Sequence, residues 1–338
     1  VPVRRDGLVS RRQAHRPRAS GSRGAAVASV ADLRCGTVVE SYGRRVVVLA
    51  DETAERLGCK VRGRKLAVVA GDRVSLQRES GRDDGAWLVV DRLPRRNVLM
   101  RTDSRGLDES IAANLDQLGI VVAPRPTCDP FIVDRYMAGA GYAGITPLLV
   151  VNKQDLLGGG EYSEGDFAFV ETFRRIGVPV AHVSAKKGSG LDQLIKCLQG
   201  KRTLLAGQSG VGKSSLTNAL CADAYQATSE LSAGTGAGRH TTVSSVIVQL
   251  PWGELADSPG VRDYAPPVVE PKSVQVGYVE IAERAVGCRF QDCVHVREPQ
   301  CAVLDAVAAG EIDPRRLESY HRLLNLTRQL DEKRGWRA

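Results

Sequence analysis

The chain has 338 residues, of which 43% are hydrophobic, and its formal net charge is +8. This length and composition allow two or three domains with hydrophobic cores, and they exclude wholesale disorder. The apolar runs are far too short to cross a bilayer, and the Arg-rich start lacks the apolar segment of a secretory signal. We therefore expect a cytoplasmic protein with no membrane partner. The positive charge favours a polyanion such as nucleic acid, although charge alone would also serve solubility.

Residues 1–30 are predicted to form a flexible basic arm. They include seven arginines among Ser, Gly and Ala, a composition that cannot bury enough surface to offset the entropy of ordering. Such an arm suits contact with RNA. The alternative is a terminus without a role, or a start assigned upstream of the true one, because the chain opens with Val1.

Residues 31–98 alternate short β-prone runs with turn residues. The runs are 37–39, 45–49, 66–69, 74–77 and 87–90, and glycines such as Gly58 separate them. Five short strands in this length predict a small closed barrel of the OB-like, oligonucleotide-binding type. A basic surface would come from Arg62, Arg64, Lys65, Arg73 and Arg78. Few aromatic residues are present for base stacking, so an inert spacer is the alternative to contact with rRNA.

Residues 99–265 alternate strands and helices in the manner of an α/β domain. The apolar runs 118–122 and 148–151 are typical of buried parallel strands, and a helix is predicted between them at 131–140. The whole chain therefore reads as a multidomain α/β protein, with a nucleotide domain that begins near residue 99.

A phosphate-binding loop follows the apolar strand predicted at 203–206 and precedes a helix predicted at 215–221, which is the context that the motif requires. The loop consists of Gly207, Gln208, Ser209, Gly210, Val211, Gly212, Lys213 and Ser214, with Ser215 next. Its glycines let backbone N–H groups surround the phosphates, Lys213 would meet the β and γ phosphates, and the Ser214 hydroxyl would bind magnesium.

Two further loops indicate guanine rather than adenine. The first is Asn152, Lys153, Gln154 and Asp155. A carboxylate at Asp155 would accept both N1–H and N2–H of guanine, whereas adenine would present a bare acceptor to it. Lys153 would lie along the base, and Asn152 would tie the loop together. The second loop is Ser184, Ala185 and Lys186, in which the Ala185 N–H would reach guanine O6. Alone each string is an ordinary turn, but together they indicate a GTP site.

The two nucleotide-sensing switches are predicted after the phosphate loop. Asp257 would hold magnesium through a water, and the Gly260 N–H would bond the γ phosphate. The Gly-rich stretch 233–238 leads to the first switch, where we favour Thr242 over Thr241 as the magnesium ligand.

Val261 stands where many GTPases have the glutamine that orients the attacking water. His240 is the nearest substitute, and the alternative is that it only caps the switch or faces solvent. The predicted reaction is phosphoryl transfer to water, with Lys213 and magnesium stabilising negative charge.

The order of these motifs indicates a circularly permuted GTPase domain. The base loops at 152 and 184 precede the phosphate loop at 207, whereas ordinary small GTPases begin with the phosphate loop. Permutation can preserve a site because chain termini tend to lie close together. The second switch then runs directly into the C-terminal segment, so we expect nucleotide state to move that segment.

A structural zinc site is predicted in the C-terminal domain, residues 266–338. Its ligands would be Cys288, Cys293, His295 and Cys301, in the pattern C-x4-C-x-H-x5-C. Three thiolates and one imidazole make a closed tetrahedral set with no position for a reacting water. The five other cysteines are scattered and are predicted to be free thiols. A helix predicted at 314–333 would pack against the zinc unit.

Together these features resemble the RsgA family of small-subunit-dependent ribosomal GTPases. The resemblance covers the basic arm, the barrel, the permuted motifs and the Cys-Cys-His-Cys set. It implies binding to the immature 30S subunit and its 16S rRNA late in assembly, hydrolysis of GTP to GDP stimulated by that subunit, and release afterwards. It also implies that His240 is catalytic. Nothing demands a dimer, so we expect a monomer. The alternatives are a permuted GTPase of the large subunit, a GTP-regulated RNA-binding factor without significant hydrolysis, and a purely zinc-dependent RNA-binding protein.

Overall fold

The computed structural model describes residues 33–335, except 64–65, 80–85, 158–166, 229–244, 259–260 and 262–263. The predicted basic arm lies outside these described residues, as do Arg64 and Lys65. Within the described part, no helix combines the length and the apolar character needed to span a membrane.

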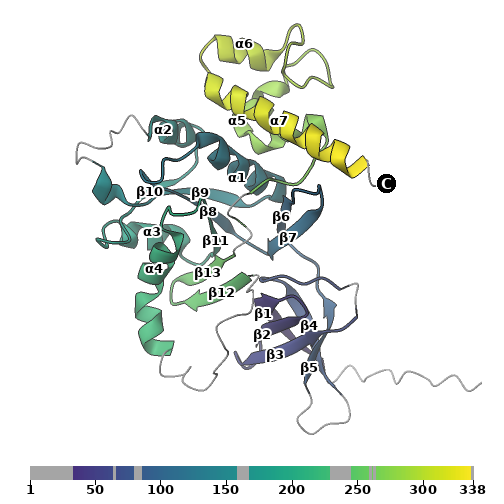
Figure 1. Ribbon diagram of the computed structural model, residues 1–338, viewed down its shortest axis with the longest axis vertical. Coiled ribbons are helices and arrows are strands. Elements are labelled where there is room, and N and C mark those ends of the chain that lie inside the picture. The colour runs from purple at the N-terminus through teal and green to yellow at the C-terminus, as the bar shows by residue number, and fades with distance from the viewer. Residues whose placement is uncertain are drawn as a thin grey trace, which may run out of the picture. The chain divides into compact units, whose positions relative to one another are not determined.

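The first five strands close into the expected OB-like barrel (Figure 1). They are β1 (Arg34–Tyr42), β2 (Arg45–Ala50), β3 (Arg56–Val61), β4 (Arg73–Arg78) and β5 (Trp87–Arg92). The pairing order is β1-β2-β3-β5-β4, and pairing of β4 with β1 closes the ring. Alternate residues point inward to form a separate core, which includes Val38, Val48, Val74, Leu76 and Val89.

One strand of the barrel differs from the sequence-based expectation. The run 66–69 is not a strand, and β3 lies earlier, across Gly58, where the sequence predicts a break between strands. The residues of β3 alternate between exposed and buried, so the period-two signal was present. Gly58 faces open space, where the lack of a side chain costs no packing, and the strand therefore runs through it.

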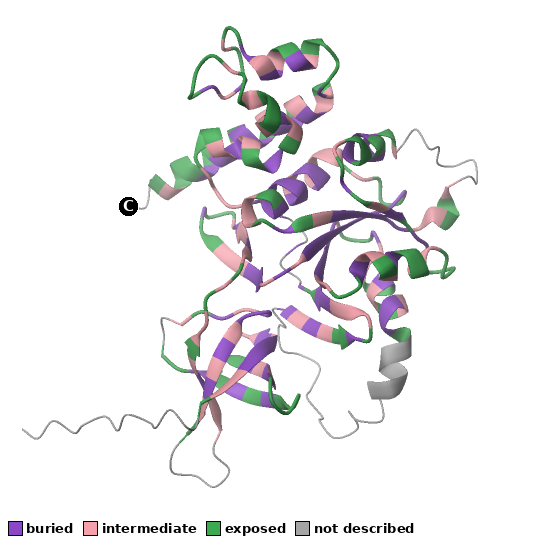
Figure 2. Ribbon diagram, turned by 180° about the vertical axis from the view of Figure 1, so that it is seen from behind, coloured by how far each residue is buried: buried purple, intermediate pink, exposed green. Residues whose placement is uncertain are grey.

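The nucleotide domain is a sheet covered by helices on both faces (Figure 2). Its strands are β8 (Gln117–Val122), β9 (Thr146–Val151), β10 (Val180–His182), β11 (Arg202–Ala206), β12 (Ser245–Leu250) and β13 (Gly253–Asp257). The order is β10-β9-β8-β11-β13-β12, and only the β12–β13 pair is antiparallel. Helices α1 (Pro130–Ala143) and α2 (Ala168–Arg175) pack on one face, and α3 (Leu191–Leu198) and α4 (Lys213–Thr228) pack on the other. The predicted strands at 118–122 and 148–151 and the helix at 131–140 are confirmed.

Local signals in the sequence explain where α1 begins and ends. The Asp129 side chain accepts a hydrogen bond from the Phe131 N–H at 2.9 Å, and Pro130 occupies the first turn, where its missing N–H costs nothing. Gly144 ends the helix at φ 65°, a left-handed conformation that favours glycine. The helix is therefore held at both ends by its own chain.

A hairpin that we did not predict joins the barrel to the nucleotide domain. It consists of β6 (Val98–Thr102) and β7 (Asp108–Ala113). Arg95, just before it, pairs with the fully buried Asp72 of the barrel at 2.7 Å. The barrel also pairs directly with the other sheet, because Glu40 and Ser41 of β1 lie opposite Val246 and Ser245 of β12. Ladder hydrogen bonds thus run from the barrel into the nucleotide domain.

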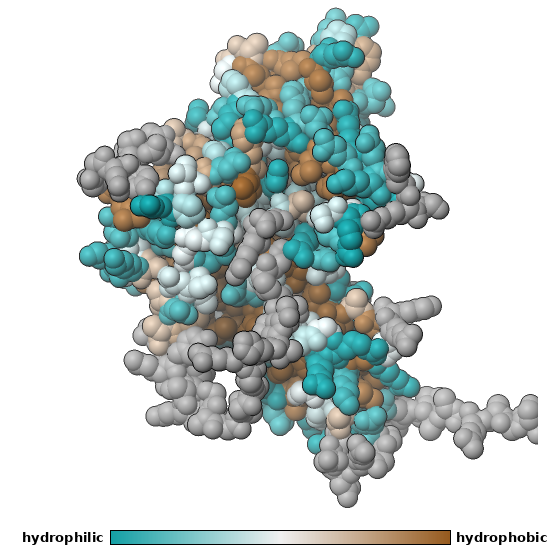
Figure 3. All heavy atoms as spheres, viewed as in Figure 1, coloured by the Kyte–Doolittle hydropathy of each residue, from teal (hydrophilic) through white to brown (hydrophobic). Residues whose placement is uncertain are grey.

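The C-terminal unit contains one 3-10 helix and three α-helices around its own apolar core. They are η5 (Pro271–Gly277), α5 (Val279–Ala285), α6 (Ala302–Ala308) and α7 (Pro314–Gly335). Helix α7 confirms the predicted C-terminal helix, and it lies across α1 (Figure 1). Most of the exposed large hydrophobic side chains of the described residues belong to this unit, and hydrophobic residues gather near the top of the space-filling view (Figure 3).

Candidate functional site

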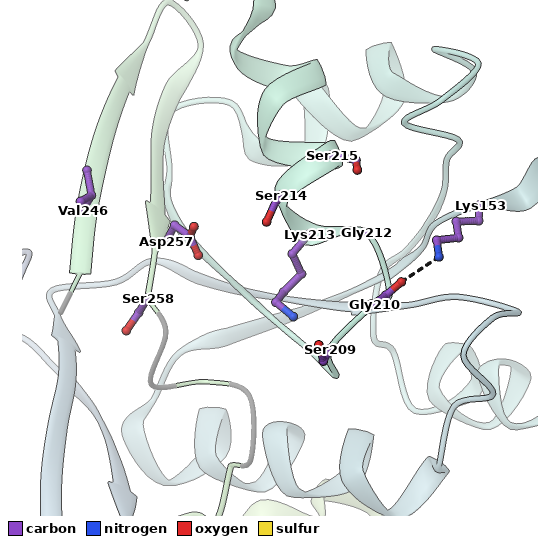
Figure 4. Close-up of a pocket in the computed structure, with 10 residues that line it drawn as sticks. All are labelled: Lys153, Ser209, Gly210, Gly212, Lys213, Ser214, Ser215, Val246, Asp257 and Ser258. Carbon is purple, nitrogen blue, oxygen red and sulfur yellow. Dashed lines mark hydrogen bonds between the residues drawn. The ribbon is translucent and has the colours of Figure 1, made fainter. Parts of the chain in front are cut away.

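A cleft of about 480 Å³ lies at the carboxyl edge of the parallel strands. Figure 4 shows the side chains that line it. The lining residues are Lys153, Ser209, Gly210, Gly212, Lys213, Ser214, Ser215, Val246, Asp257 and Ser258. The structure therefore brings parts of three predicted motifs together: the phosphate loop after β11, the base loop after β9, and the second switch after β13.

The phosphate loop has backbone geometry that only glycine allows. Gly207 has φ 140°, and a Cβ there would lie 2.3 Å from the Val121 oxygen. A Cβ on Gly212 would lie 2.5 Å from the Asn152 side-chain nitrogen. The ammonium of Lys213 donates to the carbonyls of Gly207 and Gln208, both at 2.7 Å. The loop thus wraps around its own lysine directly before α4, whose N-terminus favours a negative charge.

Asn152 connects the base loops to the phosphate loop. This fully enclosed side chain donates from Nδ2 to the Val211 carbonyl at 3.0 Å and accepts from the Ala185 N–H at 3.1 Å through Oδ1. Its neighbour Lys153 donates from Nζ to the Gly210 carbonyl at 2.7 Å, the contact drawn in Figure 4. Both residues therefore fix the distance between the surface that would read the base and the loop that would hold the phosphates.

Asp155 is exposed and is held in one orientation by a neighbour. The Ser184 hydroxyl donates to its Oδ1 at 2.5 Å. This hydrogen bond is the main reason that the pKa of Asp155 lies below its ordinary value, and the charges of Lys186 and Lys187 act in the same direction. An ionised, oriented carboxylate accepts two N–H groups of one base edge. Gln154 lies beside it and donates to the Ser189 hydroxyl at 2.9 Å.

Ser214 and Asp257 are exposed at the cleft, and Figure 4 draws their side chains next to each other. Hydroxyl and carboxylate oxygens are the ligands that Mg²⁺ prefers, together with phosphates and waters. These two residues could therefore hold a magnesium ion beside a bound nucleotide. Four other predicted site residues lie outside the described part of the chain: His240, Thr241, Thr242 and Gly260.

Sequence reasoning missed a contact between two serines, one of which, Ser258, lines the cleft. Ser245, which opens β12, and Ser258, which follows Asp257, are buried and lie 2.9 Å apart between their hydroxyl oxygens. The Ser245 hydroxyl is also 3.2 Å from the Ile111 carbonyl of β7. Neither serine belongs to a base or phosphate motif, and the signal for them is only their position where β12 begins and β13 ends.

The four predicted zinc ligands meet at one point in the C-terminal unit, with all their ligand atoms within 4.8 Å of one another. The Cys301 sulfur is 3.8 Å from that of Cys288 and 3.6 Å from that of Cys293. Nδ1 of His295 is 3.4 Å from the sulfurs of Cys293 and Cys301. Sulfurs about 3.8 Å apart are what a tetrahedral zinc site with Zn–S bonds of about 2.3 Å requires. The donor set therefore fits a closed structural zinc ion.

Two outer residues shape this cluster. Gln275 Oε1 lies 2.8 Å from His295 Nε2, so that nitrogen carries the proton and Nδ1 keeps the lone pair that a metal needs. Glu298 accepts the N–H groups of Val294 and Val296 at 3.0 and 2.7 Å. Burial acts to raise the pKa of Glu298, but these backbone donors outweigh it and lower the pKa to about 2. The ligand loop is thus held around an ionised carboxylate.

Comparisons with known proteins agree on one family. A model of the RsgA GTPase family matches residues 92–265. The chain is 40% identical over 293 residues to the small ribosomal subunit biogenesis GTPase RsgA of Azotobacter vinelandii, covering 86% of this chain and 84% of that protein. The protein of the same name from Pseudomonas aeruginosa is also 40% identical, over 291 residues, with the same coverage.

Two solved structures are similar along most of the chain. YjeQ from Thermotoga maritima has a TM-score of 0.68 at 30% identity, covering 87% of this chain and 98% of that one. YloQ, described as a circularly permuted GTPase, has a TM-score of 0.66 at 26% identity, covering 88% and 96%. The rotated order of motifs is therefore shared with proteins of known structure.

Proposed function

The chain belongs to the RsgA GTPase family, and from this premise we propose that it hydrolyses GTP on the small ribosomal subunit during biogenesis of that subunit. Its curated relatives are named as GTPases of small ribosomal subunit biogenesis. The observation that carries the proposal is the single cleft at which the phosphate loop, Lys153 of the base loop and Asp257 of the second switch meet.

In this proposal each loop has one task. Asp155 reads guanine, with Asn152, Lys153 and the loop of Ser184, Ala185 and Lys186 as its supports. Residues 207–215 hold the phosphates. Magnesium is held by Ser214, by Asp257 through a water, and by Thr242, and it neutralises the charge that develops on the phosphate oxygens. His240 positions the attacking water, because Val261 is apolar and buried and cannot do so.

We place the domain boundaries where the sequence puts them, at 1–30, 31–98, 99–265 and 266–338. The barrel and the basic arm contact 16S rRNA of the 30S subunit late in its assembly, and the factor acts as a monomer. Hydrolysis to GDP releases it. The Cys3His cluster holds one zinc ion whose role is structural, since four protein ligands leave no open position.

The test is phosphate release from GTP and from ATP, with and without purified small or large subunits. We expect release from GTP only, accelerated by the small subunit, and lost in His240→Ala without loss of nucleotide binding. Acceleration by the large subunit alone would favour the large-subunit alternative. Absence of release with nucleotide still bound would favour a GTP-regulated RNA-binding factor. Normal hydrolysis by His240→Ala would show that another group positions the water.

Base reading has a sharper test in Asp155→Asn. With xanthine, the amide oxygen would accept from N1–H and the amide NH2 would donate to the C2 oxygen. With guanine, the same NH2 would face the N2–H group, so two donors would meet with no acceptor between them. We expect affinity to move from guanine to xanthine nucleotides by about 100-fold or more. Asp192→Asn, an exposed aspartate in the first turn of α3, is the matched control and should leave both affinities unchanged. Unchanged guanine affinity in Asp155→Asn would refute the assignment.

A further inference from the structure

A buried tyrosine of helix α1 makes a hydrogen bond to the segment that follows Asp257. The hydroxyl of Tyr136 donates to the carbonyl of Val261 at 2.5 Å. Both residues are enclosed, with 1% and 0% of their surface exposed. Val261 comes directly after Gly260, the residue proposed to meet the γ phosphate. Val261 also lies three residues after Ser258, which lines the cleft.

A second tyrosine makes a further contact between this segment and α1. Tyr264, also in the segment after Asp257, stacks on Tyr136 with ring centroids 5.1 Å apart and planes 15° apart. Its hydroxyl donates to the carbonyl of Met100 in β6 at 2.8 Å. Gly139 of α1 makes room for it, because a Cβ there would lie 2.0 Å from the Tyr264 oxygen. The segment after Asp257 thus contacts one face of α1 both at Val261 and at Tyr264.

We propose that Tyr136 is a positioning residue for GTP hydrolysis, which acts by fixing the carbonyl of Val261 in the segment that follows Asp257 and Ser258 at the cleft. A displacement of about 1 Å in a group that meets the reacting phosphate costs about 100-fold in rate. The inference rests on the proposed function, because it concerns the same reaction.

The same helix carries a natural control. Tyr142 lies near the C-terminal end of α1, and its hydroxyl donates to the Val274 carbonyl of η5 at 3.1 Å. Like the Tyr136 hydrogen bond, this one joins α1 to a backbone carbonyl far away in the sequence. The accepting segment, η5, contributes no residue to the lining of the cleft. Like Tyr136→Phe, Tyr142→Phe removes from α1 one hydroxyl and its bond to a distant carbonyl, but it leaves the bond to Val261 in place.

The experiment compares Tyr136→Phe and Tyr142→Phe in the full chain, with kcat and KM for GTP measured in the absence and presence of small subunits, and with thermal unfolding measured for each. We expect kcat of Tyr136→Phe to fall at least about fivefold, the factor for one hydrogen bond, while KM stays within about twofold because only the transition state is affected. Tyr142→Phe should keep the wild-type kcat at a similar loss of thermal stability.

Three results would overturn the inference. They are an unchanged kcat in Tyr136→Phe, an equal fall in kcat in both variants, and a higher KM with unchanged kcat in Tyr136→Phe. The first shows that the bond does not matter, the second that α1 acts only through stability, and the third that the tyrosine serves nucleotide binding alone. Wild-type protein that releases no phosphate from GTP would instead refute the proposed function itself, so the two failures are distinguishable.

Discussion

Replacing Arg316 should destabilise the protein by far more than replacing an ordinary surface arginine. Its side chain is 1% exposed. It donates to Glu280 of α5 at 2.5 and 3.0 Å and to Asp134 of α1 at 2.5 Å. Asp134 is fully buried and also pairs with Arg315 at 2.7 Å. Burial acts to lower the pKa of Arg316, but these two carboxylates outweigh it and raise the pKa above its ordinary value.

The magnitude follows from what Arg316→Met leaves behind. Asp134 keeps Arg315, but Glu280, whose side chain is only 13% exposed, loses its cation. Breaking a buried pair by removing one partner costs about 3–5 kcal/mol. Since about 1 kcal/mol shifts the melting temperature of a protein of this size class by roughly 2–4 °C, we expect a fall of roughly 10 °C. The double variant with Glu280→Gln should recover much of this, because it leaves no unpaired carboxylate.

The assay is thermal unfolding followed by circular dichroism, with Arg174→Met as control. Arg174 pairs with Glu171 at 2.6 Å, but both side chains are about half exposed, and such a pair contributes only about 0.2–1 kcal/mol. The control should therefore melt within about 4 °C of wild type. If Arg316→Met melts with the control, or if the double variant is less stable than the single one, the reasoning about the unpaired carboxylate is wrong.

Three further outcomes are expected. Metal analysis should find one zinc ion per chain, and Cys301→Ser should lower this content and lower the melting temperature, whereas unchanged zinc content would remove Cys301 from the ligand set. Burial acts to raise the pKa of Asp313, but hydrogen bonds from the Thr172 hydroxyl and a backbone N–H outweigh it and hold the pKa below its ordinary value. The resulting stability is present above about pH 4 and is lost as the pH falls through the lowered pKa. The melting temperature of wild type should therefore fall in acid, and that of Asp313→Asn should lose this dependence on pH. Gly139→Ala should melt below wild type although alanine favours helices by about 1 kcal/mol, because the new Cβ would meet the Tyr264 oxygen at 2.0 Å; a higher melting temperature would contradict this packing.

Features encoded in short contiguous strings were predictable from the sequence. The phosphate-loop string between its strand and helix, the parallel strands around α1 and the cluster of three cysteines and one histidine each correspond to a local sequence pattern. The order of these strings predicted the permutation, which the relatives of known structure share. The barrel was predicted as a fold, but one of its strands was misplaced, because Gly58 in an alternating run was read as a break.

Contacts between distant segments could not be predicted in this way. Arg316 and Asp134 are 182 positions apart, and Tyr136 and Val261 are 125 positions apart. The residues around Tyr136 in the sequence do not predict a hydrogen bond from its hydroxyl to the Val261 carbonyl, because a tyrosine in an amphipathic helix is an ordinary core residue. Such pairings depend on how whole elements dock, which single-sequence patterns do not encode.

The pairing of β1 with β12 has a consequence for synthesis on the ribosome. Ser41 and Ser245 are opposite each other in the sheet, yet roughly two hundred residues separate them along the chain. The barrel sequence emerges first and can close on its own five strands, but the outer edge of β1 at Ser41 stays unpaired until β12 has been made. Exposed strand edges promote wrong pairing between chains, and contacts distant in sequence form slowly. The nascent chain therefore passes through a stage in which the barrel has folded while the edge of β1 at Ser41 is still unpaired and accessible to other chains.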